Sequence, residues 1–408
     1  MLSAAWLAVV GWLPTDAELA ARLTAEAEAR LGVKVAIGSA RWALLPKPVV
    51  VVNDFRTQQA QPLVIRQLSA YPNVRVLLHR KLVLERIDID DAIFPRDSVH
   101  ALHGKPDARE PDAGDGVPLE HVGFRNLTWI SYSGIAVAYD GEIDFDAHWR
   151  PRHAELRRPG ASPPFSLTST REGDSDRWQM RIHVGGGTAH GNVALKLATD
   201  GAMHLSGQLV PHEIEVASAL STFNRRSPVG GKSSGRTVLS ADGKSAKELA
   251  RSLHTRTVFS VDPATILRFD LDKAISTLGK EHDGQTALQA LTGQMDTQNT
   301  GQGMRVTYTG LKARAGNYTA TGEATIYRSR IEASGTLDLV EGAVGVPFTV
   351  SGPVNKPTAS MPPGVFAGAA IGTAVLPGIG TVIGARIGGA LGRIFKGGAQ
   401  PPGAPAPE

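Results

Sequence analysis

A serine-containing stretch is the first feature of this chain whose residue types and spacing suggest catalysis. Residues 231–235, GKSSG, match the G-x-S-x-G pattern in which a strand-to-helix turn raises a serine nucleophile, here Ser233. The stretch lies instead in a Gly/Ser-rich segment, SPVGGKSSG, that leads into the strand-like RTVLSA. We therefore interpret this segment as a loop and expect no catalytic serine.

Histidines and aspartates offer further candidates, for metal binding and for acid–base chemistry. His100 and His103 form an H-x-x-H pair, but no third ligand follows at a spacing typical of a zinc site. Asp88 and Asp90 could act as a carboxylate pair, but they alternate with isoleucines, as on a strand with one solvated face. We predict that the chain is not an enzyme and expect neither a cofactor nor a metal site.

The composition is that of an ordinary folded protein. The chain has 408 residues, of which 42% are hydrophobic and 20% charged, and its formal net charge is +4. This length corresponds to two or three domains, although large β structures run longer as one unit. No basic stripe is interleaved with aromatic residues, so we expect no nucleic-acid partner. Cysteine is absent, which excludes disulfides and thiolate metal sites.

The N-terminal region predicts one helix followed by strands. Thr15 and Glu18 form a capping box, apolar residues recur at helical spacing up to Leu31, and Gly32 ends the pattern. The β-branched runs KVAIGS and PVVVVNDFR follow, and RKLVLERIDID continues the strand signal. Residues 1–14 are apolar but shorter than the ~20 residues that span a bilayer. We interpret them as the end of a truncated membrane anchor, with a buried first helix as the alternative.

A segment without periodicity separates this region from a long β-rich region. Residues 97–117 are rich in proline, glycine and charge, so we interpret them as a linker, with an ordered functional loop as the alternative. Within residues 118–362, apolar and polar residues alternate with period two, as in RWQMRIHV and NVALKL. This alternation predicts many long amphipathic strands.

Only a few helices accompany these strands. One is predicted at about 213–223, a second begins at a Ser245 cap and continues to Leu253, and a third would carry Leu271 and Leu278. Helices so short cannot cover both faces of a large sheet. The predicted fold class is therefore mainly β with a few short helices, a long amphipathic antiparallel sheet being curled into a groove. A sheet folded on itself as a sandwich, or closed as a barrel, is the alternative.

An apolar sheet face that is left uncovered would bind something apolar. The apolar positions of the alternating strands supply the candidate lining of such a groove. These lipid-groove candidates are Trp178, Met180, Ile182, Val184, Val193, Leu195, Leu197, Leu205, Leu209, Val306, Ile326 and Leu337.

Glycines near the C-terminus recur every four residues on both sides of a proline. At 3.6 residues per turn, this spacing places small residues along one stripe of each of two helices, which can then approach closely in apolar surroundings. We predict that residues 363–398 form a hairpin that lies on or dips into a membrane, with burial against the sheet as the alternative, and that residues 399–408 form a disordered tail. The hairpin candidates are Gly364, Gly368, Gly372, Pro377, Gly380, Gly384, Gly388 and Gly392.

Two stretches of the sequence carry motifs in the order found in a known family. The first is LAARLTAEAEARLGVKVAIGSARWALLPKPVVVVNDFR, continued by VRVLLHRKLVLERIDIDDAIF. The second is GGKSSGRTVLSADGKSAKELARSLHTRTVFSVDPATILRFDLDKAIS, with VPFTVSGPVNKPTASM as its closing strand. They resemble the N-terminal module and the C-terminal region of the AsmA family. In this chain the module corresponds to residues 15–96, and the C-terminal region lies within residues 118–362.

This resemblance implies a protein of the Gram-negative envelope, anchored in the inner membrane with its body in the periplasm. Members of the wider class have long groove-like β-sheets thought to carry phospholipid acyl chains toward the outer membrane. The implied function is non-enzymatic: handling phospholipid between the two membranes or assisting outer-membrane biogenesis. The implied partners are phospholipid, or another acyl-chain lipid, and the membrane. The alternative is a structural or regulatory periplasmic protein with a closed β-sandwich and no transported ligand.

Overall fold

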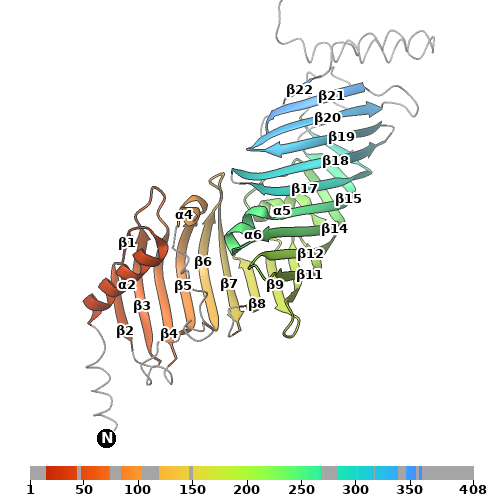
Figure 1. Cartoon of the computed structure of the whole chain (residues 1–408). Helices are drawn as coiled ribbons and strands as arrows, with labels where there is room; N and C mark the ends of the chain where they lie inside the picture. Colours follow the sequence, from red (N-terminus) through yellow and green to blue (C-terminus); the bar gives the residue numbers. More distant parts are fainter. Residues whose placement is uncertain are drawn as a thin grey trace, which may run out of the picture. The chain divides into compact units, whose positions relative to one another are not determined.

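Long β-strands and a few short helices make up the structure (Figure 1). Strands account for 66% of it and four helices are described, which confirms the predicted mainly β class. The chain forms two compact units, the first of residues 1–184 with 222–224 and the second of residues 185–221 with 225–408. The computed structural model describes residues 15–43, 47–73, 84–102, 119–146, 150–267, 270, 283–300, 302–316, 318–338, 346–354 and 358–360.

The first unit contains a sheet in which the strands from β3 to β10 follow one another in chain order. β1 and β2 both pair with β3 at one edge. The pairing is antiparallel except between β5 and β6, which are parallel. The strands are β1 (Val35–Ala36), β2 (Ser39–Ala43), β3 (Val49–Thr57), β4 (Val64–Pro72), β5 (Leu84–Pro95), β6 (His121–Ile130), β7 (Ala136–Phe145), β8 (Pro151–Arg158), β9 (Phe165–Arg171) and β10 (Arg177–Val184).

A capped helix covers the start of this sheet. The helix α2 (Asp16–Leu31) begins at the predicted capping box of Thr15 and Glu18, and it ends at Gly32, whose φ of 69° is left-handed. Its residue Leu19 is buried in a core cluster with apolar residues of β2, β3 and β4. The prediction of this helix from its caps and spacing is therefore confirmed.

The first residues of the segment 97–117 are not a linker, contrary to the prediction. Arg96–His100 form the short helix α4, and Val99 and Leu102 pack against a core cluster that contains Ile65. The segment is polar in composition, but two apolar residues three positions apart are enough to bind one helical turn to the sheet. From residue 103 to 118 the chain lies outside the described residues.

The second unit contains a sheet with antiparallel pairing. The short strands β13 (Ile214–Glu215) and β16 (Gln285–Leu288) pair with β14 and β15, respectively, beside the main order. That order is β11 (Gly187–Leu197), β12 (Met203–His212), β14 (Val229–Gly243), β15 (His254–Leu267), β17 (Ala290–Thr300), β18 (Gly303–Ala315), β19 (Tyr318–Tyr327), β20 (Arg330–Asp338), β21 (Val346–Pro353) and β22 (Thr358–Ser360).

Two of the predicted helices are found beside this sheet. The helix α5 (Val216–Thr222) lies within the predicted range, and α6 (Ala246–Ser252) begins at a Ser245 cap whose side chain accepts a hydrogen bond from the backbone N–H of Glu248. The third helix, predicted around Leu271 and Leu278, lies outside the described residues.

Residues 229–235 form the first half of β14, so their interpretation as a loop is wrong. Ser233 lies opposite Val261 of β15, and a shift in register between Gly231 and Ser233 marks a β-bulge. Gly231 has a φ of 122°, and a Cβ at Gly235 would lie 2.1 Å from a backbone oxygen of β15. The glycines therefore permit close strand pairing. Ser233 does not occupy the strand-to-helix turn that a raised nucleophile requires.

Candidate functional site

The pairing register places the candidate residues of the second unit on one face of its sheet. Residues directly opposite each other on paired strands point to the same face. Leu195 lies opposite Leu205, Val306 opposite Ile326, and Ile326 opposite Ile331. We call this side the apolar face. Its larger side chains are Val193, Leu195, Leu197, Met203, Leu205, Leu209, Leu239, Phe259, Leu291, Met295, Met304, Val306, Tyr308, Leu311, Ile326, Ile331, Leu337, Phe348 and Val350.

Charge separates the two faces completely in the later strands. Among the described residues of β17 to β21, the apolar face carries no charged side chain. Polar atoms on it are few, and they come from Thr297, Asn299 and Tyr308. The charged residues of these strands all lie on the opposite face, and they are Asp296, Arg305, Lys312, Arg314, Glu323, Arg330, Glu332 and Asp338.

Helices cover the apolar face beside its first strands, and this cover reaches the end of β17, where the side-chain amide of Asn299 donates to the carbonyl of Ala250 in α6. Val216 of α5 packs on the buried core residues Val261, Ala264 and Leu288. Farther along the chain, none of the residues described between positions 290 and 354 is buried. The inner faces of a β-sandwich are buried, so the described strands β17 to β21 form a single layer instead. Figure 1 shows α5 and α6 beside the β12–β15 part of this curled sheet.

Exposure differs between the two faces. On the polar face, Val238 and Val258 are 50% and 58% exposed, whereas leucines of the apolar face in β12 and β14 are half-buried. Burial raises the pKa of Tyr308, whose ring meets Phe259 edge to face at 6.3 Å. Tyr308 is nevertheless accessible to solvent. The ring of Tyr308 is therefore largely enclosed by neighbouring side chains and is still reached by solvent.

Two residues of the apolar face depart from this pattern because of their position. Leu197 is 70% exposed and Met304 is 59% exposed. Both lie at strand ends beside the turns that lead into or out of their strands, where a side chain has fewer neighbours. The sheltered part of the apolar face is therefore its centre.

The four remaining groove candidates belong to the first unit. Trp178, Met180, Ile182 and Val184 share one face of β10, as their alternation predicts. Trp178 and Val184 are buried, at 8% and 9% exposure, and the indole N–H of Trp178 donates to the carbonyl of Pro151 at 2.7 Å. These two side chains are therefore packed within the first unit, and their assignment to a groove stays a prediction. Met180 and Ile182 are half-buried.

The aspartates of β5 have partners on the polar face of the first unit. The Nε of Arg125 donates to Asp90 at 2.7 Å, and Asp88 lies 2.9 Å from an arginine guanidinium. A hydrogen bond of 2.6 Å from Asn126 lowers the pKa of Asp91. These contacts are those of a solvated strand face, as the alternation with isoleucines indicates.

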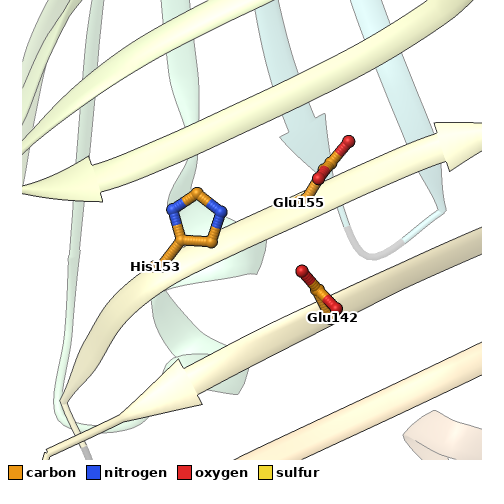
Figure 2. A group of neighbouring side chains, drawn as sticks. All are labelled: Glu142, His153 and Glu155. Carbon is orange, nitrogen blue, oxygen red and sulfur yellow. The ribbon is translucent and has the colours of Figure 1, made fainter.

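A cluster of three side chains on the first unit was not anticipated from the sequence. Glu142 of β7 and His153 and Glu155 of β8 each offer a ligand atom, and these atoms lie within 4.8 Å of one another (Figure 2). The H-x-E spacing of His153 and Glu155 on a strand was the available signal. Its significance depends on the pairing of β8 with β7, which the sequence does not specify.

No protein-family model, curated protein or solved structure matches this chain. None of the helices in the described part of the chain is long and apolar enough to cross a membrane. The residues of the predicted hairpin, Gly364, Gly368, Gly372, Pro377, Gly380, Gly384, Gly388 and Gly392, lie outside the described residues, as do residues 1–14.

Proposed function

We propose that the apolar face of the second unit binds lipid acyl chains and that the chain is a non-enzymatic lipid-handling protein. The observation that carries this proposal is the stretch from β17 to β21, whose described residues form a charge-free apolar face on which no side chain is buried. Water contact with apolar surface costs about 25 cal/mol per Å². A ligand that covers this face removes that cost.

The chemistry of the apolar face favours an alkyl chain as its occupant. An alkyl chain needs no hydrogen-bond partner, and this face offers few. Small residues at Ala320, Ala324 and Ala333 keep the centre of the face smooth. A protein partner would bring backbone and polar groups that need their own hydrogen bonds, and typical protein interfaces supply several such bonds.

The resemblance to the AsmA family supports a place for this activity in the Gram-negative envelope. In this proposal an N-terminal anchor holds the chain in the inner membrane and the two units lie in the periplasm. Phospholipid moving between the two membranes is then the lipid that the apolar face would meet. A reporter enzyme that is active only in the periplasm, fused after residue 354 and expressed from the full reading frame, tests the location. An inactive reporter excludes it.

The proposal is tested by placing the same charge on opposite faces of one strand. Ile326→Asp puts a carboxylate on the apolar face of β19, whereas Thr321→Asp puts one on the polar face, opposite Lys312. We expect Ile326→Asp to lower the affinity for a fluorescent phospholipid by about tenfold or more, because burying a carboxylate against an alkyl chain is costly. Thr321→Asp should bind as the unmodified chain does.

Lipids that copurify with each variant, measured by mass spectrometry, provide a second readout. Equal binding by both variants, or no lipid bound to the unmodified chain, would refute the proposal. Circular dichroism serves as the folding control. Loss of the β signal in Ile326→Asp alone would instead support the alternative of a closed sandwich, in which this position is core.

A further inference from the structure

Two glutamates face each other across neighbouring strands of the first unit. Glu142 of β7 and Glu155 of β8 are direct cross-strand partners, and both are half-buried. Like charges that stand directly opposite destabilise a strand pair. Glu142 makes no hydrogen bond or ion pair with any of the residues that the structure describes. Glu142 therefore has no ion-pair partner of its own among the described residues.

An imidazole completes this group on the same face of the sheet. His153 lies two positions before Glu155 on β8, and Figure 2 shows its ring beside the two carboxylates. Its Nδ1 atom lies 3.3 Å from the hydroxyl oxygen of Thr170 on β9, which leaves Nε2 for another ligand. A histidine that binds a metal through one nitrogen is commonly oriented by a hydrogen bond at the other.

The remaining neighbour of the cluster leaves room for a cation. Arg157 Nε lies 3.1 Å from Oε1 of Glu155, and its side chain is 60% exposed. The second oxygen of that carboxylate remains available, because a carboxylate offers lone pairs on both oxygens. The cluster therefore keeps one acceptor from each of its three residues.

This combination differs from the other histidine–carboxylate contacts of the chain. His121 lies 2.7 Å from Asp144, His204 2.5 Å from Asp242, and His254 3.2 Å from Asp296. Each of these is an imidazole with a single carboxylate. Within the described ranges, only Glu142, His153 and Glu155 bring an imidazole and two carboxylates together.

We propose that Glu142, His153 and Glu155 bind one divalent first-row transition metal ion, with zinc as its representative. Two carboxylates and an imidazole are ligands that zinc accepts at about 2.0–2.2 Å, whereas an imidazole is a poor ligand for calcium or magnesium. The ligand atoms, which lie within 4.8 Å of one another, converge on such an ion by small rotations of the glutamate side chains. Three protein ligands leave a coordination position open to water.

The ion would link β7 to β8 and remove the repulsion between the two glutamates. Both strands lie in the interior of the strand order of the first unit, so this link would stabilise the folded state of that unit. The site lies on the polar face, and it does not depend on the binding of lipid to the second unit.

The test uses the full chain, freed of metal with a chelator and titrated with zinc chloride by calorimetry. We expect one equivalent to bind to the unmodified chain, and the affinity of Glu142→Gln to be at least tenfold weaker. His204→Asn removes a more exposed imidazole that has one carboxylate partner, and it should bind zinc as the unmodified chain does. Unchanged zinc affinity in Glu142→Gln and in Glu155→Gln would overturn the proposal.

Thermal unfolding separates metal binding from a purely structural role of the glutamates. Without metal, Glu142→Gln should unfold at the same temperature as the unmodified chain or higher, because a repulsion is removed. Zinc should raise the midpoint of the unmodified chain and of His204→Asn but not that of Glu142→Gln. Calcium chloride should raise neither. A calcium effect equal to that of zinc would mean that the imidazole is not a ligand, and it would overturn the proposal.

Discussion

The two units build the same kind of amphipathic sheet but treat its apolar face differently. In the first unit, α2 and α4 cover that face and produce two core clusters with buried residues in β2, β3, β4 and β5. In the second unit, buried core residues gather around Val261, and none of the residues described from 290 to 354 is buried. Beyond that cluster, the apolar face of the second unit has no buried side chains among the described residues.

Alternation along a strand therefore identifies an apolar face, but it does not determine whether a second layer covers that face. Met180 and Ile182 of the first unit and Val193 and Leu195 of the second follow the same period of two. Whether helices cover the apolar face depends on which connections between strands contain a helix. It also depends on where the pairing of the strands places those connections. Within the described residues, the presence of covering helices on one apolar face and their absence from much of the other is the physical basis for the proposal that the second unit binds a ligand.

The largest expected effect compares one truncation in the two settings. Ile65→Ala removes a buried side chain from the second core cluster of the first unit and should destabilise that unit by about 3 kcal/mol. Ile326→Ala removes a half-buried side chain and should cost the second unit about 1 kcal/mol or less. Equal losses would mean that the face around Ile326 is a covered core.

Urea titrations can follow the two units separately. All six tryptophans occur before residue 185, so tryptophan fluorescence reports the unfolding of the first unit. Far-ultraviolet circular dichroism reports both units. Ile65→Ala should move the fluorescence transition, and Ile326→Ala should leave it in place.

A second prediction uses the absence of native cysteines. A single cysteine at Ala92, which is 1% exposed in the first unit, should react with a thiol reagent much more slowly than one at Ala324 on the apolar face. The difference should be roughly a hundredfold or more, because a buried thiol reacts only during opening events that cost several kcal/mol. Thr321→Cys on the polar face is the exposed reference. Labelling of Ala324→Cys as slow as that of Ala92→Cys would contradict the comparison.

Local signals in the sequence were sufficient for α2, α5 and α6 and for most strands, but not for α4, which lies in the segment interpreted as a linker. The caps at Thr15 and Ser245 act within a few residues of themselves, and the structure retains both. The composition of residues 229–235 is typical of a loop, whereas in the structure their glycines permit close pairing with the neighbouring strands. The register between two strands depends on residues that are far apart in the chain, so local sequence signals do not determine it.

The candidate sites show the same limit of sequence analysis. The alternation gave the apolar side of each strand, but the burial of Trp178 depends on contacts with Pro151 and Arg171 of other strands. The opposition of Glu142 and Glu155 appears only when β7 and β8 are paired. The glycines after residue 363 stay a prediction.

The smallest expected effect concerns α5, a helix that covers part of the apolar face of the second unit. Glu215 accepts backbone hydrogen bonds from Ala217 and Ser218 in the first turn of α5 and from Gly231 of β14. Burial alone would raise the pKa of Glu215, but these N–H donors outweigh it and hold the pKa below its usual value of 4.5. The carboxylate therefore ties α5, whose residue Val216 packs on the core, to the sheet.

Glu215→Gln should reduce the stability of the second unit by about 1 kcal/mol at pH 7, as the loss of a helix cap does. Because the folded state lowers the pKa of Glu215, the carboxylate stabilises the unit above pH 4.5, and this contribution is lost as the pH falls through the folded-state pKa. The urea midpoints of the variant and the unmodified chain should therefore differ at pH 7 and converge at lower pH.

Glu213→Gln, at an exposed ion pair with Lys232, is the matched control and should change little at either pH. The urea midpoints of Glu215→Gln and the unmodified chain could instead still differ in acid. That result would show that the amide disturbs packing and that the attachment of α5 to the sheet does not depend on the charge of Glu215.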